Sequence, residues 1–158
     1  MADSSISDIT TASDRYKIYV LPCTPENLSE RIDFVKTHHV PVINIGKELA
    51  SFIDTLADYS YLNIDVYDFT KKLLESSKST ITSTGNDVVA IYNLGILLEP
   101  SLELNAAYML REFSKSSALI IIWENESENP DKLNWPSQKN KFSLDFSQMQ
   151  IKKLQYAI

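Results

Sequence analysis

Two segments of the chain are hydrophobic at almost every position. Residues 87–92 read DVVAIY, and residues 118–123 read ALIIIW. Strands that are covered on both faces of a parallel sheet show such continuous runs, whereas strands with one solvated face alternate. We therefore expect both segments to be central strands of a parallel sheet.

The rest of the chain up to residue 123 alternates between two kinds of pattern. Short runs rich in β-branched and aromatic residues predict strands, and hydrophobic residues at intervals of three and four predict amphipathic helices. The predicted strands are 16–21, 40–45, 87–92 and 118–123, and the predicted helices are 25–37, 47–56, 65–75 and 101–115. This alternation predicts an α/β fold: a three-layer parallel sheet with helices on both faces and right-handed crossovers.

The two ends of the chain have weaker patterns. Residues 1–14 are small, polar and acidic, so we expect a flexible N-terminal arm that contributes little to the fold. Residues 15–158 are long enough for a single α/β domain with a sizeable core. Within it, residues 142–146 alternate and predict an edge strand, whereas residues 148–158 fit either a strand or a helix.

Composition restricts the classes of partner. The formal net charge is -6, and an acidic domain is a poor ligand for phosphodiester backbones or anionic lipid surfaces. We therefore expect neither direct nucleic-acid binding nor membrane binding. The longest hydrophobic run, 118–123, is far shorter than a membrane span, and the single cysteine, Cys23, excludes an intrachain disulfide. These features predict a cytoplasmic protein.

The turn after the first predicted strand, residues 22–27, reads PCTPEN and contains neither glycine nor lysine. A phosphate-binding loop needs glycines, which let backbone N–H groups approach the phosphates, and a lysine that faces the β- and γ-phosphates. The sequence therefore predicts that this turn is not a working phosphate loop.

Three segments nevertheless resemble a known family. They are 42–49 (VINIGKEL), 87–98 (DVVAIYNLGILL) and 110–123, in which LREFS precedes IIIW. Together they are similar to BrxF, a small P-loop-containing component of BREX-type bacteriophage-exclusion systems, and the similarity covers residues 16–146. The resemblance implies a P-loop NTPase-like fold.

The resemblance also shows where this chain departs from the family. The positions that match the Gly-Lys-Thr of a phosphate loop hold Glu26, Asn27 and Leu28, and Tyr92 replaces the strand-end aspartate that helps to hold magnesium. Asparagine lacks the charge of lysine, and Glu26 repels phosphates. The Gly-Lys pair at 46–47 follows the second strand and is no substitute. Degenerate Walker A and Walker B motifs are therefore expected, which argues against ATP hydrolysis.

The resulting hypothesis is a pseudo-ATPase: a non-catalytic P-loop-like interaction or regulatory component of a prokaryotic antiphage defence system. It predicts protein partners from a defence complex, leaves a homo-oligomer open, and predicts neither a cofactor nor a metal. The alternative is a small α/β enzyme or binding module for a nucleotide or phosphorylated metabolite, with its site at the strand carboxyl ends near Cys23, Asn44 and Asn93. A third hypothesis is a ring-forming adaptor that borrows a neighbour's nucleotide.

Three tyrosines and one arginine are candidates for an interface. Tyr59, Tyr61 and Tyr67 lie close together in the sequence, and tyrosine is enriched at protein interfaces. Packing in the core is the alternative for Tyr61 and for Phe69. Arg111 is a candidate for the arginine that subunits of related ATPases offer to a neighbour's nucleotide, with an exposed cation near a helix end as the simpler explanation.

Other constellations are weaker. Cys23 with His38 or His39 is a conceivable nucleophile pair, but the sequence supplies nothing that would activate the thiol. Two carboxylate pairs have helical spacing, and the preference of negative charge for helix N-termini explains them more simply. These pairs are Asp65 with Asp68 and Glu99 with Glu103. Cysteine, histidine and acidic residues nowhere have the spacing of a metal site.

Overall fold

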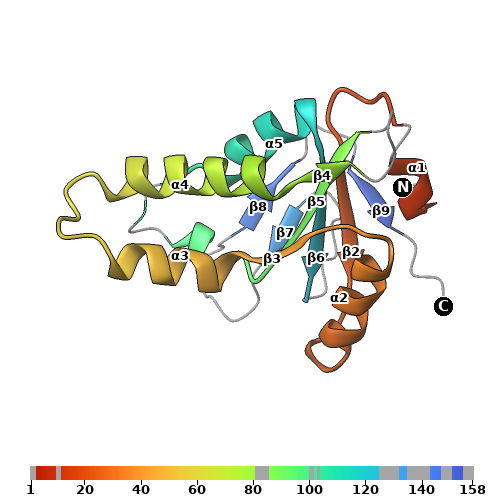
Figure 1. Cartoon of the computed structure of the whole chain (residues 1–158), viewed down its shortest axis with the longest axis horizontal. Coiled ribbons are helices and arrows are strands. Elements are labelled where there is room, and N and C mark those ends of the chain that lie inside the picture. The colour runs from red at the N-terminus through yellow and green to blue at the C-terminus, as the bar shows by residue number, and fades with distance from the viewer. Residues whose placement is uncertain are drawn as a thin grey trace.

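The computed structural model describes residues 3–9, 12–80, 86–99, 102, 104–124, 132–134, 143–146 and 151–154. They form an α/β fold in which helices flank a mainly parallel sheet (Figure 1). The strands are β1 (Asp3–Ser4), β2 (Ile18–Pro22), β3 (Val42–Asn44), β4 (Ser79–Thr80), β5 (Asp87–Tyr92), β6 (Ala118–Trp123), β7 (Lys132–Asn134), β8 (Ser143–Asp145) and β9 (Lys152–Leu154). The α-helices are α1 (Ile6–Ile9), α2 (Leu28–Thr37), α3 (Ile45–Asp54), α4 (Leu62–Ser77) and α5 (Ala106–Ser116), and the 3₁₀ helices are η1 (Pro25–Asn27) and η2 (Gly95–Leu98).

The main sheet has seven strands in the order β1-β9-β2-β6-β5-β3, with β4 paired antiparallel to β5. Every pair along that order is parallel. Strands β5 and β6 match the predicted segments 87–92 and 118–123 in both bounds, and each has a neighbour on both sides. The prediction of a parallel sheet with both strands in its interior is confirmed, although β6 is central and β5 lies next to the edge strand β3.

Side chains of the central strands alternate between two hydrophobic cores. In β6, Ala118, Ile120 and Ile122 belong to a core closed by α1 and α2, while Leu119, Ile121 and Trp123 belong to a core closed by α3, α4 and α5. All six are at most 2% exposed. Because both faces of the strand are buried, the run is hydrophobic throughout. Helices on both faces of the sheet, as the sequence predicted, are confirmed.

Residues 3–9 were expected to lie in a flexible arm, but they are part of the fold. Strand β1 pairs with β9 at the edge of the sheet. Ile6 and Ile9 are 3% and 0% exposed and pack in the same core as Val35 of α2. The Asn86 side-chain amide donates to the carbonyl oxygens of Ile9 and Ala12 at 2.8 and 2.9 Å. Two isoleucines in a polar segment are too few to give a periodic signal, but burying them is enough to hold the segment.

The C-terminal segments form two different structures. Residues 148–158 fitted either a strand or a helix from the sequence. Their described part contains a strand, β9, which is parallel to both β2 and β1. The edge strand predicted at 142–146 exists as β8, but it pairs antiparallel with β7 in a separate two-stranded sheet. Leu133, Leu144 and Phe146 are buried against the core that α3, α4 and α5 close.

Two helices begin at residues that the hydrophobic pattern did not identify. Helix α5 was predicted from residue 101 but begins at Ala106, because Asn105 caps it: its side-chain oxygen accepts from the N–H of Tyr108 at 3.0 Å. Helix α4 was predicted from residue 65 but begins at Leu62, which packs against the core. Capping and tertiary burial, rather than periodicity, set these boundaries.

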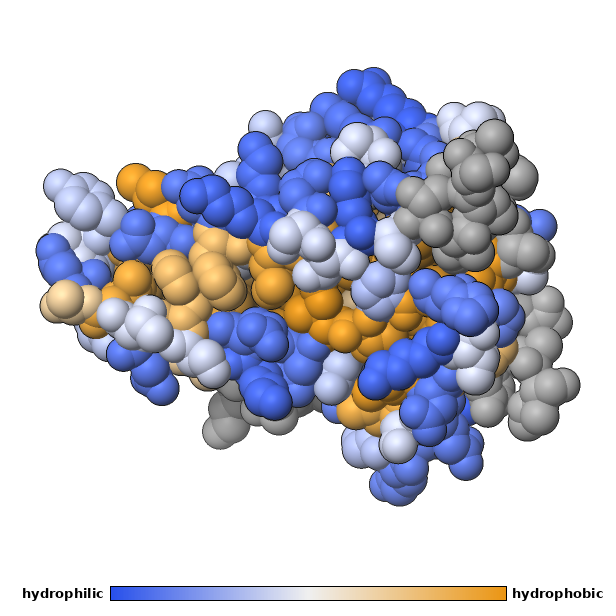
Figure 2. Space-filling view, viewed as in Figure 1, coloured by the Kyte–Doolittle hydropathy of each residue, from blue (hydrophilic) through white to orange (hydrophobic). Residues whose placement is uncertain are grey.

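Helices α3 and α4 form a long hairpin that projects away from the sheet (Figure 1). Phe52 of α3 and Phe69 of α4 stack within it, with ring centroids 4.1 Å apart and planes at 7°. Figure 2 shows hydrophobic side chains gathered in a band between the two helices, whose outer sides are mostly hydrophilic. Among the described residues, no helix combines the length and the hydrophobicity that crossing a bilayer would require.

Candidate functional site

The neighbouring strands β2 and β6 send the chain to opposite faces of the sheet. After β2 the chain enters α2, whose Val35 lies in one core, whereas the residues after β6 return with Leu133 and Leu144 in the other core. Open α/β sheets place ligands outside the strand carboxyl ends at such a switch point. We call this end of the sheet the carboxyl edge. Its residues are Cys23 and Thr24 after β2, Glu124 after β6, Asn93 after β5 and Asn44 at the end of β3.

The turn after β2 is closed by its own hydrogen bonds. The N–H of Cys23 donates to the carbonyl of Trp123 at 2.8 Å, and the N–H of Thr24 donates to Asn27 Oδ1 at 2.7 Å. The N–H of Asn27 in turn donates to the carbonyl of Thr24 at 3.1 Å, and Pro25 has no N–H. Four of the five residues 23–27 therefore have no backbone N–H to offer to a phosphate.

The structure describes all four positions that were expected to be degenerate, which are Glu26, Asn27, Leu28 and Tyr92. Asn27, where the family resemblance expects lysine, holds the turn together, and Glu26 beside it is exposed. Leu28 is half-buried against the α2 core, and so is Tyr92, where that resemblance expects a metal-holding aspartate. At these four positions the structure thus places an exposed carboxylate, an amide that holds the turn, and two half-buried side chains, and none of them carries a positive charge.

Gly46 of the Gly-Lys pair packs against Asn93 at the carboxyl edge. Asn93 has a left-handed backbone (φ 59°), and its side-chain N–H donates to Asn44 Oδ1 at 2.8 Å. The same Asn44 oxygen accepts the N–H of Lys47 at 3.0 Å and so caps α3. A Cβ at Gly46 would lie 2.4 Å from Asn93 Nδ2. Glycine is therefore required for the close approach of Asn93, independently of any ligand.

Cys23 is buried and is not an activated thiol. Burial and the charge of Glu124 raise the pKa of its thiol to about 11, against a smaller opposing effect of Arg31. His38 and His39 follow the end of α2 whereas Cys23 precedes its start, so the 10-residue helix separates them by about 15 Å. His38 Nδ1 instead lies 2.9 Å from the carbonyl oxygen of Phe34. The nucleophile pair considered from the sequence is not assembled.

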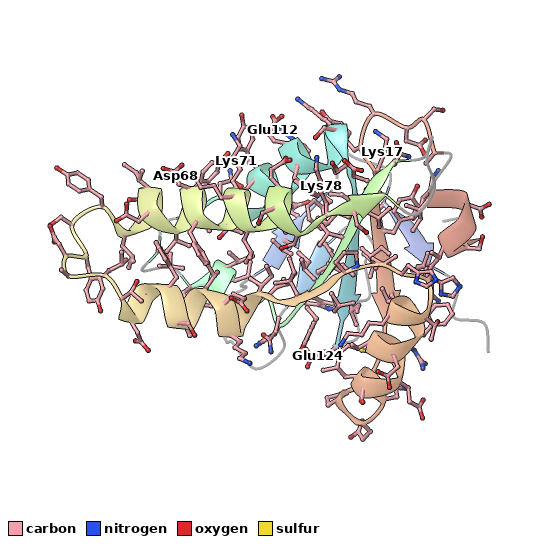
Figure 3. The ribbon with its side chains drawn as sticks, in the orientation of Figure 1. Lys17, Asp68, Lys71, Lys78, Glu112 and Glu124 are labelled. Atoms are coloured by element: carbon pink, nitrogen blue, oxygen red, sulfur yellow. The ribbon has the colours of Figure 1, made fainter. Side chains whose placement is uncertain are left out.

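Glu124 is a residue of the carboxyl edge that the sequence reasoning missed. Figure 3 labels it at the end of β6. It is half-buried, and burial raises its pKa. The available signal was its position as the first charged residue after an entirely hydrophobic strand. A half-buried carboxyl group at a switch point can accept or donate a hydrogen bond to a ligand.

The structure describes three of the four residues in the candidate carboxylate pairs. Asp65 and Asp68 lie in the first two turns of α4, and Asp68 is exposed. Glu99 is exposed after η2, and Glu103 lies outside the described residues. Within the part of the chain that the structure describes, no three cysteine, histidine or acidic side chains come together as a metal site.

The candidate interface residues occupy two different regions. Tyr59 and Tyr61 are 58% and 65% exposed at the end of the α3–α4 hairpin. Core packing, the alternative for Tyr61, therefore does not apply, whereas it does apply to Phe69. Tyr67 is half-buried and lines a groove of about 400 Å³ between α4 and α5. Arg111 lies on α5 with its guanidinium 5.2 Å from the ring of Tyr108.

Comparison of the chain with family models, with curated proteins and with solved structures found no match.

Proposed function

We propose that this protein is a non-catalytic, P-loop-like scaffold that acts through protein contacts as an interaction or regulatory component of a prokaryotic antiphage defence system. The observation that carries the proposal is the closed turn after β2. Three of its N–H groups are used by Trp123, Asn27 and Thr24, and Pro25 has none, so most of the backbone that would cradle phosphates already has partners in the fold. A scaffold role keeps the sheet and its helices while dispensing with the phosphate loop.

Electrostatics supports the same proposal. A lysine and a phosphate oxygen about 4 Å apart attract each other by about 4 kcal/mol at an effective dielectric constant of 20. Asn27 provides none of this attraction, and the exposed carboxylate of Glu26 opposes it. Tyr92 has no carboxylate to hold magnesium, so the charge on ATP would stay uncompensated.

The placement of this activity in defence rests on the resemblance of segments 42–49, 87–98 and 110–123 to BrxF. The projecting hairpin, with Tyr59 and Tyr61 exposed at its end, is the kind of surface that an interaction component needs. The proposed partners are therefore other proteins of a defence complex.

A phage-challenge assay tests the proposal in cells. In a host that carries the complete system, removal of this chain should abolish protection, and re-expression should restore it. Tyr92→Phe and Glu26→Gln should restore protection as well as the wild type, because a scaffold does not use these side chains for hydrolysis. Protection that survives removal of the chain would contradict the role in defence, and loss of protection in these two variants would contradict the scaffold.

A binding module for a nucleotide or phosphorylated metabolite is the second candidate. Asn93 supports it, because a residue held in the left-handed region at a strand carboxyl end is often part of a site. Its amide group and the half-buried Glu124 both lie at the carboxyl edge. Thermal-shift screening with phosphorylated metabolites tests this candidate: a ligand that stabilises the wild type but not Asn93→Gly would favour it over the scaffold.

A further inference from the structure

The free end of the α3–α4 hairpin is acidic and aromatic. From residue 48 to residue 70 the chain contains five carboxylates and no lysine, arginine or histidine. We define the hairpin tip as residues 54–68. Its exposed side chains include Asp54, Asp58, Tyr59, Tyr61, Ile64 and Asp68. Large hydrophobic and aromatic groups among carboxylates are typical of a docking surface and are costly to leave in water.

A cluster of cations lies at the amino ends of the strands. We define the basic patch as Arg15, Tyr16, Lys17, Arg111 and Lys115. The ring of Tyr16 has three cations around it, with centroid distances of 5.2 Å to Arg15, 5.9 Å to Lys115 and 6.0 Å to Arg111. Lys17 donates to the carbonyl of Lys115 at 3.0 Å, which brings a fourth cation to the cluster.

Among the described residues, one ion pair compensates part of the charge of the basic patch. Glu112 pairs with Lys115 at 2.8 Å, and the exposed ring of Tyr108 lies beside Arg111. Within the part of the chain that the structure describes, the four cations have one carboxylate paired with them, in a protein whose net charge is -6. Such a local excess of positive charge suits an acidic surface, while the overall negative charge disfavours a nucleic-acid backbone.

The exposed tyrosines of the hairpin tip, Tyr59 and Tyr61, lie far from the basic patch of their own chain. Lys78, which follows α4, donates to Ser117 next to the end of α5 at 3.0 Å, so the C-terminal end of α4 is the end near the patch. Tyr61 precedes the other end of this 16-residue helix, about 24 Å away. Figure 3 shows Asp68 and Lys17 toward opposite ends of the molecule.

We propose that the hairpin tip of one chain docks on the basic patch of a second copy. Carboxylates of the tip pair with the cations of the patch, and tyrosines of the tip pack against the guanidinium groups. Because the two surfaces differ, the contact is heterologous and repeats head to tail into a ring or an open filament. This assembly does not depend on the nucleotide site. A single helical hairpin buries little area, so the contact is weak and depends on salt.

Sedimentation velocity tests the assembly at protein concentrations of about 10 to 500 µM, the range in which a small interface is measurable. The wild type should show species larger than a monomer at about 50 mM salt, and these should dissociate at about 500 mM. Two variants each remove one surface. The patch variant is Arg15→Glu with Lys115→Glu, and the tip variant is Tyr61→Ala with Asp68→Lys; all four side chains are on the surface.

Mixing the two variants gives the decisive result. Each variant alone should be monomeric, with apparent association weakened at least about tenfold. The patch variant keeps an intact tip, and the tip variant keeps an intact patch, so an equimolar mixture should form a dimer that cannot grow further. Lys36→Glu with Lys47→Glu is the matched control for the patch variant, because it also replaces two cations by glutamate, at exposed positions outside both surfaces. It should assemble like the wild type.

Three outcomes would overturn the proposal. They are a wild type that stays monomeric at about 500 µM in low salt, a patch or tip variant that assembles like the wild type, and an equimolar mixture without a dimer. Circular dichroism and a thermal melt of each variant establish that loss of assembly does not come from loss of folding.

Discussion

At the residue scale, side-chain hydrogen bonds hold the carboxyl edge together. Asn27 holds the turn after β2, and the pair of Asn44 and Asn93 joins the ends of β3 and β5. The sequence showed that the turn lacks glycine and lysine, and this was enough to doubt a phosphate loop. It could not show that Gly46 makes room for Asn93, because Gly46 of α3 and Asn93 after β5 are distant in the sequence.

Gly46→Ala should lower the free energy of unfolding by about 1 to 3 kcal/mol, the usual cost of overpacking. The added Cβ would lie 2.4 Å from Asn93 Nδ2. Asn93→Gly removes this side chain and suits the positive φ. In urea unfolding, the double variant should therefore lose less stability than the sum of the two single variants. Additive effects would show that the contact does not limit residue 46.

Stability should fall at alkaline pH because two buried acids hold their protons more tightly in the folded chain. Burial, with the charge of Glu124, raises the pKa of Cys23 from 9.0 to about 11. Burial, with the charges of Asp14 and Asp8, raises that of Tyr19 from 10.0 to about 12. Their contribution is fully present below about pH 9 and is lost as the pH rises through the folded-state values.

Urea unfolding from pH 7 to pH 10.5 measures this effect. Cys23→Ala removes one of the two acids, so its stability should fall less steeply above pH 9 than that of the wild type. Identical slopes for the two proteins would mean that the thiol does not contribute.

At the element scale, the sequence predicted the elements with the most uniform environment. Strands β5 and β6 were predicted in full because both of their faces are buried. Strand β1 and helix α1 were not, because they are short and are held by a few contacts with distant residues such as Asn86. The start of α5 depends on one capping side chain, Asn105, which periodicity does not reveal.

We expect Lys78 to stabilise the fold by joining α4 to β5 and to the residue that precedes β6. Its ammonium group lies 2.9 Å from Glu75 of α4, 3.5 Å from Asp87 of β5 and 3.0 Å from Ser117 before β6. Burial alone would lower its pKa, but the hydrogen bonds and charges of Glu75 and Asp87 outweigh burial and raise it.

Lys78→Met should therefore cost about 1 to 3 kcal/mol, because charged hydrogen bonds are lost at a partly buried position. Lys72→Met is the control, since Lys72 is exposed on the same helix, and it should change stability by less than about 0.5 kcal/mol. Chemical denaturation measures the free energy of unfolding of both variants. Equal losses would show that the contacts of Lys78 do not stabilise the fold.

At the scale of the whole molecule, the sequence predicted the class of fold but not its organisation. The order β1-β9-β2-β6-β5-β3 depends on pairings between distant segments, and the switch point between β2 and β6 follows from that order. Likewise, Tyr59 and Tyr61 could be identified as interface candidates, but their position at the end of a projecting hairpin depends on how α3 and α4 pack. The strand order and the packing of α3 on α4 thus place the carboxyl edge and the hairpin tip in different regions of the molecule.

The closed turn after β2 should not bind nucleotide. A titration of the protein with a fluorescent ATP analogue, with and without magnesium, measures this. We expect no saturable fluorescence signal up to about 1 mM analogue, and the same signal for the wild type and for Glu26→Gln. Saturable binding at micromolar concentration that unlabelled ATP reverses would contradict the account, because it would require N–H groups that Trp123, Asn27 and Thr24 already use.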